Sequence, residues 1–246
     1  GHLQLIACAG SGKTEVVARR VVELLRPQGG CALEPRNVLA FTFTERAAAE
    51  LKERITTRVR ESLGEVAGLA EMFVGTIHGF CLDLLRREAP VFLGYNVLDE
   101  VAQRMLIERH PERSGFRAAR LVTGDELVPW RDTGVYIKAL DVLRQGDVDP
   151  ARLHGVTAAE GLRAWRELLE DRRCLDYTAI LEHAVRLLTE DAGVGARIRA
   201  RVRHVIVDEY QDVNPIQERV VRALAGLGAW LCLVGDDDQS IYQWNG

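Results

Sequence analysis

The stretch from Gly10 to Thr14, GSGKT, constrains the fold more than any other part of this sequence. It lies between an apolar run, LQLIA, and a stretch with helical periodicity, EVVARRVVELL. Two glycines this close together favour a tight turn, because glycine adopts positive φ at little cost. A short apolar run, a glycine-rich turn and a helix, in this order, predict a strand that turns directly into a helix. The alternative is a glycine-rich turn that binds nothing.

Short apolar runs alternate with helical patterns along both ends of the chain. The runs NVLAFTF and MFVGT each precede a helical pattern, at 45–62 and 77–87, and HVIVDE and AWLCLVG supply further strands. This alternation is typical of a parallel sheet with helices on both faces. Strand patterns end near Pro90, and residues 99–174 have a mainly helical pattern interrupted by loop markers.

The sequence therefore predicts an α/β fold interrupted by a helical insertion. Residues 1–98 and 175–246 form one domain in this prediction, and residues 99–174 form the inserted one. The chain enters a strand almost at once and stops just after a loop, so we expect it to be a fragment of a longer protein.

Composition excludes several classes of protein. A net charge of −4 over 246 residues argues against a protein that coats nucleic acid by bulk electrostatics, although a local basic groove remains possible. No apolar run reaches the roughly 20 residues of a membrane helix, which favours the cytoplasm. Five scattered cysteines without a C-x-x-C pair indicate reduced thiols. Only three basic residues are lysines, and one of them, Lys13, falls in the glycine-rich turn.

The glycine-rich turn has the features of a phosphate-binding loop. Its backbone N–H groups and the positive N-terminal end of the following helix attract an anion. Lys13 is suited to the β and γ phosphates of a nucleotide, and the Thr14 hydroxyl to Mg²⁺. The candidate nucleotide-binding residues are Ala9, Gly10, Ser11, Gly12, Lys13 and Thr14, and Thr14 is also a candidate metal ligand.

Acidic residues follow two of the later strand patterns. Asp208 and Glu209 end the run HVIVDE, at the carboxyl edge of a predicted parallel sheet, where ligands of such folds bind. Asp208 can hold Mg²⁺, and Glu209 can accept a proton from the attacking water. The alternative is a solvated cap of the next helix, which Asn214 and Pro215 would begin. Gln239 follows three aspartates at the same edge and can contact a γ-phosphate or its water.

Five segments together resemble a known family. ACAGSGKT, VLAFTFTERAAAELKERI, VGTIHGFCLDLLR, VIVDEYQDVNPIQ and LCLVGDDDQSIYQWNG are similar, in order, to motifs I, Ia, Ib, II and III of the UvrD/Rep/PcrA-type superfamily 1 DNA helicases. LDYTAILEHAVRLL also resembles the helix before motif II. The resemblance implies a RecA-like domain 1A carrying an inserted domain 1B. It also implies ATP-driven 3'-to-5' translocation on single-stranded DNA, unwinding at junctions with duplex, and a second RecA-like domain that lies outside this sequence.

The resemblance also assigns roles to individual residues. Lys13, Asp208, Glu209 and Gln239 take catalytic roles, with Gln239 as the γ-phosphate sensor, and Gln211 couples the nucleotide to DNA. The implied DNA-binding residues are Thr42, Phe43, Thr44, Thr76, His78, Tyr242 and Trp244. Aromatic side chains stack on bases without reading sequence, which suits a motor.

Several alternatives remain open. Without the family, Phe43 and Phe80 would be assigned to a core, and His78 with Cys81 to a structural or DNA-facing role in preference to a metal site. Asn245 stands where the family often has arginine, so a side chain expected to couple ATP to DNA lacks its charge. The rival functions are a nucleotide-gated DNA-binding module without strand displacement, and an unrelated P-loop ATPase or kinase.

Overall fold

The computed structural model describes residues 2–6, 12–27, 33–120, 124–146 and 157–236. The chain divides into two compact units. The first contains the described residues up to Leu84, then Ala184–Val213, then the described residues from Gln217 onward. The second contains Leu85–His183 and Asn214–Ile216.

The first unit is built on a five-stranded, fully parallel sheet. Its strands lie in the order β1 (Leu3–Ile6), β7 (Trp230–Gly235), β6 (His204–Val207), β2 (Val38–Thr42) and β3 (Phe73–Thr76). Parallel neighbours need a crossover, and the intervening helices supply it. The sheet confirms the α/β prediction and the strands expected from the alternating pattern.

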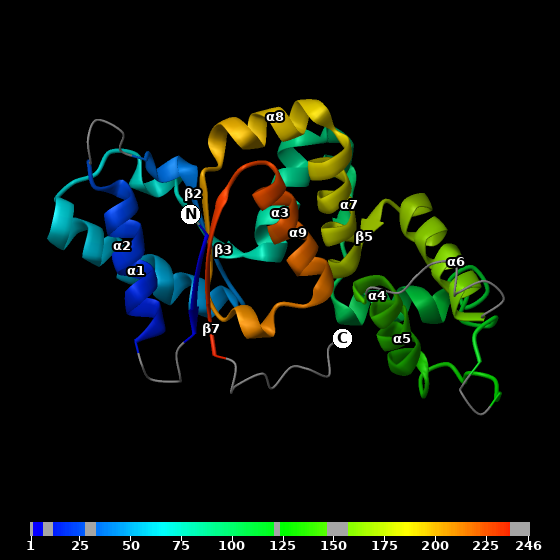
Figure 1. Ribbon diagram of the computed structural model, residues 1–246. Helices are drawn as coiled ribbons and strands as arrows, with labels where there is room; N and C mark the ends of the chain where they lie inside the picture. The colour runs from blue at the N-terminus through cyan, green and yellow to red at the C-terminus, as the bar shows by residue number, and fades with distance from the viewer. Residues whose placement is uncertain (1, 7–11, 28–32, 121–123, 147–156, 237–246) are drawn as a thin grey trace. The chain divides into compact units, whose positions relative to one another are not determined.

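Helices cover both faces of this sheet. In Figure 1, α1 (Lys13–Leu25) and α2 (Glu45–Leu63) lie on one side, and α8 (Ala192–Arg201) and α9 (Pro215–Gly226) lie on the other. Every residue of β2 is buried, as expected for a strand covered on both faces. Helix α3 (Ile77–Glu88) follows β3, and its Phe80 packs edge-on against Phe41 of β2.

The core between the sheet and the α1/α2 pair explains why these helices form. Val17, Val21 and Leu25 of α1 recur at helical spacing and are all buried. They pack in one cluster with residues of α2, including Leu51 and Ile55. Burial of this apolar stripe against the strands holds α1, and therefore the turn before it, at the carboxyl edge of the sheet.

The second unit is mainly helical. Its elements are η3 (Pro90–Gly94), β4 (Asn96–Val97), α4 (Glu100–Arg109), α5 (Thr133–Gln145), α6 (Thr157–Asp171) and β5 (Cys174–Leu175), followed by α7 (Tyr177–Glu190), which continues past His183. The prediction that strands end near Pro90 is wrong, because β4 and β5 pair as a small parallel sheet. Two-residue strands are too short to show periodicity. That residues 99–174 form a separate inserted domain stays a prediction.

A buried ionic cluster lies inside this second unit. Nη1 of Arg144 is 2.6 Å from Oδ2 of Asp176, and Nη2 of Arg144 is 2.7 Å from Oε2 of Glu182. The indole N–H of Trp165 donates to Asp176 at 2.8 Å, and the backbone N–H of Ala179 donates to the same carboxylate at 2.7 Å. The cluster therefore ties α5 and α6 to the start of α7.

No helix among the described ranges is long and apolar enough to cross a membrane.

Candidate nucleotide and DNA site

Gly12 and Lys13 begin the site at the end of the glycine-rich turn. Gly12 has φ 87° and ψ 26°, the left-handed conformation that glycine adopts without strain, and it is the N-cap of α1. Positive φ is what the sequence predicts for a turn that exposes backbone N–H groups to an anion. Ala9, Gly10 and Ser11 lie outside the described residues.

Lys13 is buried among acidic side chains from two other strands. Its Nζ lies 3.4 Å from Oε2 of Glu209, which follows β6, and 3.8 Å from Oδ2 of Asp236, which follows β7. The lysine side chain is only 8% exposed. Three segments far apart in the sequence thus meet at one sheet edge, because parallel strands all end there.

Asp208 is a buried carboxylate at this edge, and its pKa is raised. Burial, followed by the nearby charge of Glu209, raises the pKa of Asp208 to about 6 from an ordinary 3.8. A hydrogen bond from the Thr14 side chain acts in the opposite direction and lowers this pKa. The predicted pair of metal ligands, Thr14 and Asp208, therefore lies in direct contact.

These two oxygen donors fit a magnesium ion. Mg²⁺ prefers oxygen ligands and is typically held by one or two protein side chains together with substrate phosphates and waters. A site of that kind needs no larger set of protein ligands. Among the residues that the structure describes, no group of three or more His, Cys, Asp or Glu side chains could hold a metal ion.

Gln211 joins the acidic edge to the neighbouring strand. Its Nε2 donates to Oε2 of Glu209 at 2.8 Å, and its Oε1 accepts from the backbone N–H of Asp236 at 3.0 Å. Glu209 has φ 54°, a left-handed conformation that is uncommon outside glycine. The glutamine therefore holds the carboxylate of Glu209 in place beside Lys13, although the backbone of Glu209 has an uncommon conformation.

A narrow pocket at the same edge joins the acidic residues to four of the predicted DNA-binding residues. Thr42 and Thr76 end β2 and β3, and Phe43 and His78 follow them closely. The lining residues are Phe41, Thr42, Phe43, Thr76, Ile77, His78, Val207, Asp208, Glu209, Val213 and Gln217. Residues predicted to contact nucleotide and residues predicted to contact DNA are therefore neighbours.

The aromatic side chains of this region divide into two kinds. Phe43 is 39% exposed, whereas Phe80 is 2% exposed and packs with Phe41 and Phe73. Phe43 is thus accessible to a base, and Phe80 is a core residue. Tyr242, Trp244 and the predicted sensor Gln239 lie outside the described residues.

Two of the predicted DNA-binding threonines also form hydrogen bonds within the fold. Thr44 is the N-cap of α2, where its Oγ1 accepts from the N–H of Ala47 at 3.1 Å. Oγ1 of Thr76 donates to Oε1 of Glu45 at 2.8 Å and accepts from the N–H of Gly79 at 3.0 Å. Both threonines therefore have a structural role in addition to any contact with DNA.

His78 is uncharged at neutral pH, because burial lowers its pKa to about 4. Its N–H can donate a hydrogen bond to a phosphate, but the neutral ring supplies no charge. Cys81 is fully buried. Cys81, Cys174 and Cys232 all have free thiols. The predicted reduced state of the thiols stays a prediction.

Comparison with known proteins decides the family. The model of the UvrD/REP helicase N-terminal domain matches residues 1–246. The chain belongs to the UvrD/REP helicase family. It is 31% identical over 261 residues to the ATP-dependent DNA helicase UvrD1 of Mycobacterium leprae, covering 99% of this chain and 32% of that protein.

Two further UvrD/REP helicases show the same extent of similarity. The ATP-dependent DNA helicase PcrA of Staphylococcus aureus is 29% identical and Rep of Escherichia coli is 31% identical, and both alignments cover 100% of this chain. They cover 32% of PcrA and 35% of Rep. The chain therefore spans about a third of the length of these helicases.

Two residues of this UvrD/REP chain were missing from the predicted site. Glu45 binds the hydroxyl of Thr76, and the sequence offers no signal for that pairing across 31 positions. Asp236 lies beside Lys13, and it is the first of the three aspartates that the sequence already places at this edge. A role for Asp236 follows only once the strands are aligned.

Proposed function

We propose that the chain is the N-terminal part of an ATP-dependent DNA helicase that moves 3'-to-5' along single-stranded DNA and unwinds duplex at junctions. The observation that carries this proposal is the contact of Lys13 with Glu209 and Asp236, beside the Thr14–Asp208 pair. One ammonium surrounded by carboxylates at a helix N-terminus is a site prepared for a triphosphate with its magnesium ion.

Each residue of this edge has a specific role in the proposal. Lys13 leaves its carboxylate partners to bind the β and γ phosphates, and Thr14 and Asp208 hold the magnesium ion. The ion, when bound, neutralises charge on the phosphate oxygens. Glu209 accepts the proton of the attacking water. Gln211 orients the Glu209 carboxylate for this role through its hydrogen bond. Gln239 senses the γ-phosphate.

Coupling to DNA follows from the shared pocket. Loss of the γ-phosphate would change the surroundings of Asp208 and Glu209, which line the same pocket as Thr42, Phe43, Thr76 and His78. The exposed ring of Phe43 can stack on a base, and Thr44, Tyr242 and Trp244 extend this DNA contact in the proposal. The full motor also needs a second RecA-like domain, and we place its activity in the cytoplasm.

The test compares Lys13→Ala with Lys52→Ala, which removes an exposed lysine on α2. Lys13→Ala should weaken binding of magnesium ATP to the 246-residue chain at least tenfold, measured by calorimetry, and Lys52→Ala should leave it unchanged. Lys13→Arg retains the positive charge but has a bulkier guanidinium, so it should also bind weakly. Parent-like ATP binding by both Lys13 variants would refute the proposed site.

Strand displacement separates a motor from a nucleotide-gated clamp. In a protein that carries this chain together with the second RecA-like domain, Lys13→Ala should abolish ATP hydrolysis and displacement of a paired strand together. A clamp would bind DNA in response to ATP, but it would displace no strand even without the Lys13→Ala substitution.

A further inference from the structure

A second pocket lies at the opposite, amino edge of the same sheet. Asn37 and Arg203 immediately precede β2 and β6, and Glu71 ends a short helix before β3. The pocket has a volume of about 650 Å³ and is lined by Glu34, Arg36, Asn37, Glu71, Ala200, Arg201 and Arg203. Because Asp208 and Glu209 follow the other end of β6, this pocket is separate from the nucleotide site.

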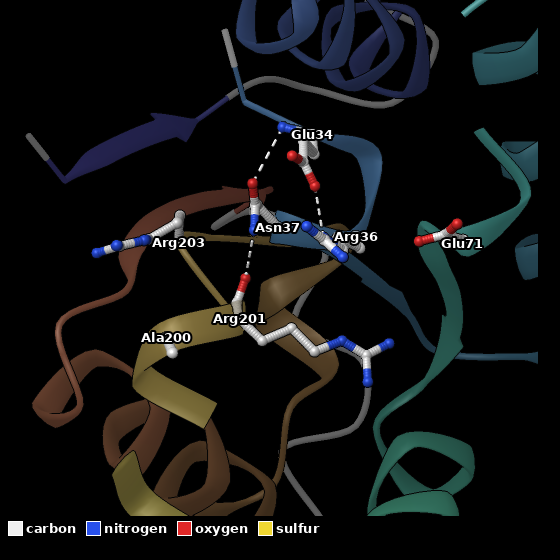
Figure 2. Close-up of a pocket in the computed structure, with 7 residues that line it drawn as sticks. All are labelled: Glu34, Arg36, Asn37, Glu71, Ala200, Arg201 and Arg203. Atoms are coloured by element: carbon white, nitrogen blue, oxygen red, sulfur yellow. Dashed lines mark hydrogen bonds and ion pairs between the residues drawn. The ribbon is translucent and has the colours of Figure 1, made fainter. Parts of the chain in front are cut away.

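Asn37 joins the segments that line this pocket through hydrogen bonds. Its Oδ1 accepts from the backbone N–H of Glu34 at 3.0 Å, and its Nδ2 donates to the backbone carbonyl of Arg201 at 2.8 Å. Its own carbonyl accepts from the backbone N–H of Arg203 at 2.9 Å. The segment that carries the two arginines is therefore tied to the segment before β2, and Figure 2 shows the hydrogen bonds of the Asn37 side chain.

The pocket has free positive charge on a protein whose net charge is −4. Arg36 is neutralised by an ion pair with Glu34. Within the described part of the chain, the guanidinium groups of Arg201 and Arg203 form no hydrogen bond or ion pair, which leaves Glu71 as the one acidic residue of the lining that offsets them. In Figure 2, Arg201 extends toward the side of Glu71, and Arg203 extends to the opposite side of Asn37. Two separated charges suit a polyanion better than a single small anion.

We propose that this pocket binds the phosphate backbone of duplex DNA. Arginine forms paired hydrogen bonds with phosphate oxygens. Among the described residues of the lining none is aromatic and available to stack on an unpaired base, whereas duplex DNA presents its phosphates outward. Ala200 is the one apolar residue among them, and a single small side chain is a poor anchor for a protein partner. The inference rests on the proposed DNA binding and adds a second contact to it.

The test measures binding of a short blunt-ended duplex to the 246-residue chain, without nucleotide, over a series of salt concentrations. Each phosphate contact contributes about 0.9 to the slope of log affinity against log salt. The double variant R201Q/R203Q should therefore bind more weakly and lower that slope by about 2. R201K/R203K retains both charges and should retain most of the slope. Glu71→Gln removes a repulsive charge and should tighten binding.

The matched control, R186Q/R222Q, removes two exposed arginines that are each paired with a glutamate four positions away. It should leave the slope nearly unchanged. An equal loss in the control, or an unchanged slope in R201Q/R203Q, would overturn the inference. Competition by polyglutamate as effective as that by duplex would assign the pocket to an acidic protein and also overturn it. Nucleotide binding by Lys13→Ala is measured separately, so the two proposals can fail independently.

Discussion

At the scale of single residues, Asp208 shows how the site departs from ordinary protein chemistry. Its side chain is buried beside another carboxylate, and both effects raise its pKa to about 6. An acid whose pKa is raised by folding binds its proton more tightly in the native state than in the unfolded one. Ionisation of Asp208 therefore lowers the free energy of unfolding as pH rises from about 4 to about 6. Above about pH 6 the full loss remains.

Replacing Asp208 with asparagine should remove this cost. The difference between 3.8 and about 6 corresponds to roughly 3 kcal/mol, an upper value for the gain in the free energy of unfolding at neutral pH. The gain should shrink as pH falls from about 6 and vanish near pH 4. Urea unfolding at neutral pH and at about pH 4 would measure this difference. Asp171→Asn, at an exposed carboxylate, is the control. A gain equally large at about pH 4 would contradict the assignment.

The predicted magnesium ligand thus reduces the stability of the free protein. A bound magnesium ion would offset that cost, since a cation favours the ionised carboxylate. The sequence predicted Thr14 and Asp208 as ligands of one magnesium ion, but it did not predict the hydrogen bond between them. That contact depends on α1 and β6 ending at the same edge.

At the scale of elements, the ionic cluster of the second unit joins three segments through buried side chains. Arg144, Asp176 and Trp165 come from α5, the turn after β5, and α6, and all three are buried. The segment LDYTAILEHAVRLL resembles a helix of the family, but the sequence indicates no partner for Asp176. The partners lie 11 and 32 positions away, beyond the reach of any local pattern.

Removing one member of this cluster should destabilise the chain strongly. Asp176→Ala leaves the Arg144 guanidinium buried with one carboxylate fewer, at a cost of roughly 3 to 5 kcal/mol in the free energy of unfolding. The double variant Arg144→Met with Asp176→Leu should lose less, because it leaves no uncompensated charge. Urea unfolding followed by circular dichroism measures both, with Arg163→Gln, at an exposed position of α6, as the control. A double variant less stable than Asp176→Ala would argue against this account.

At the scale of the whole molecule, the chain spans about a third of the helicases it resembles. The motifs quoted from its sequence end at motif III, and the family resemblance implies that further arginines reach the ATP cleft from a second RecA-like domain. Such cations stabilise charge in the transition state. In the proposal, the residues around Lys13 at the carboxyl edge of the sheet therefore form one half of the catalytic site.

The 246-residue chain should accordingly hydrolyse ATP slowly. Turnover should rise by on the order of 10³-fold or more when the second RecA-like domain is present in the same protein. Phosphate release, with and without single-stranded DNA, measures this difference, and ATP binding by the short chain confirms that it is folded. Substantial DNA-stimulated turnover by the short chain alone would show that its own residues complete the site.

The sequence by itself determined the order of strands and helices in the α/β part, because periodicity and glycine turns act locally. It also placed Lys13 in the turn that begins a helix, and Asp208 and Glu209 at the end of a strand. Only the tertiary structure decided that Lys13 pairs with Glu209 and Asp236, and that Phe43 is exposed where Phe80 is buried. These facts depend on which strands are neighbours, and the order β1-β7-β6-β2-β3 is set by long-range packing that no local pattern records.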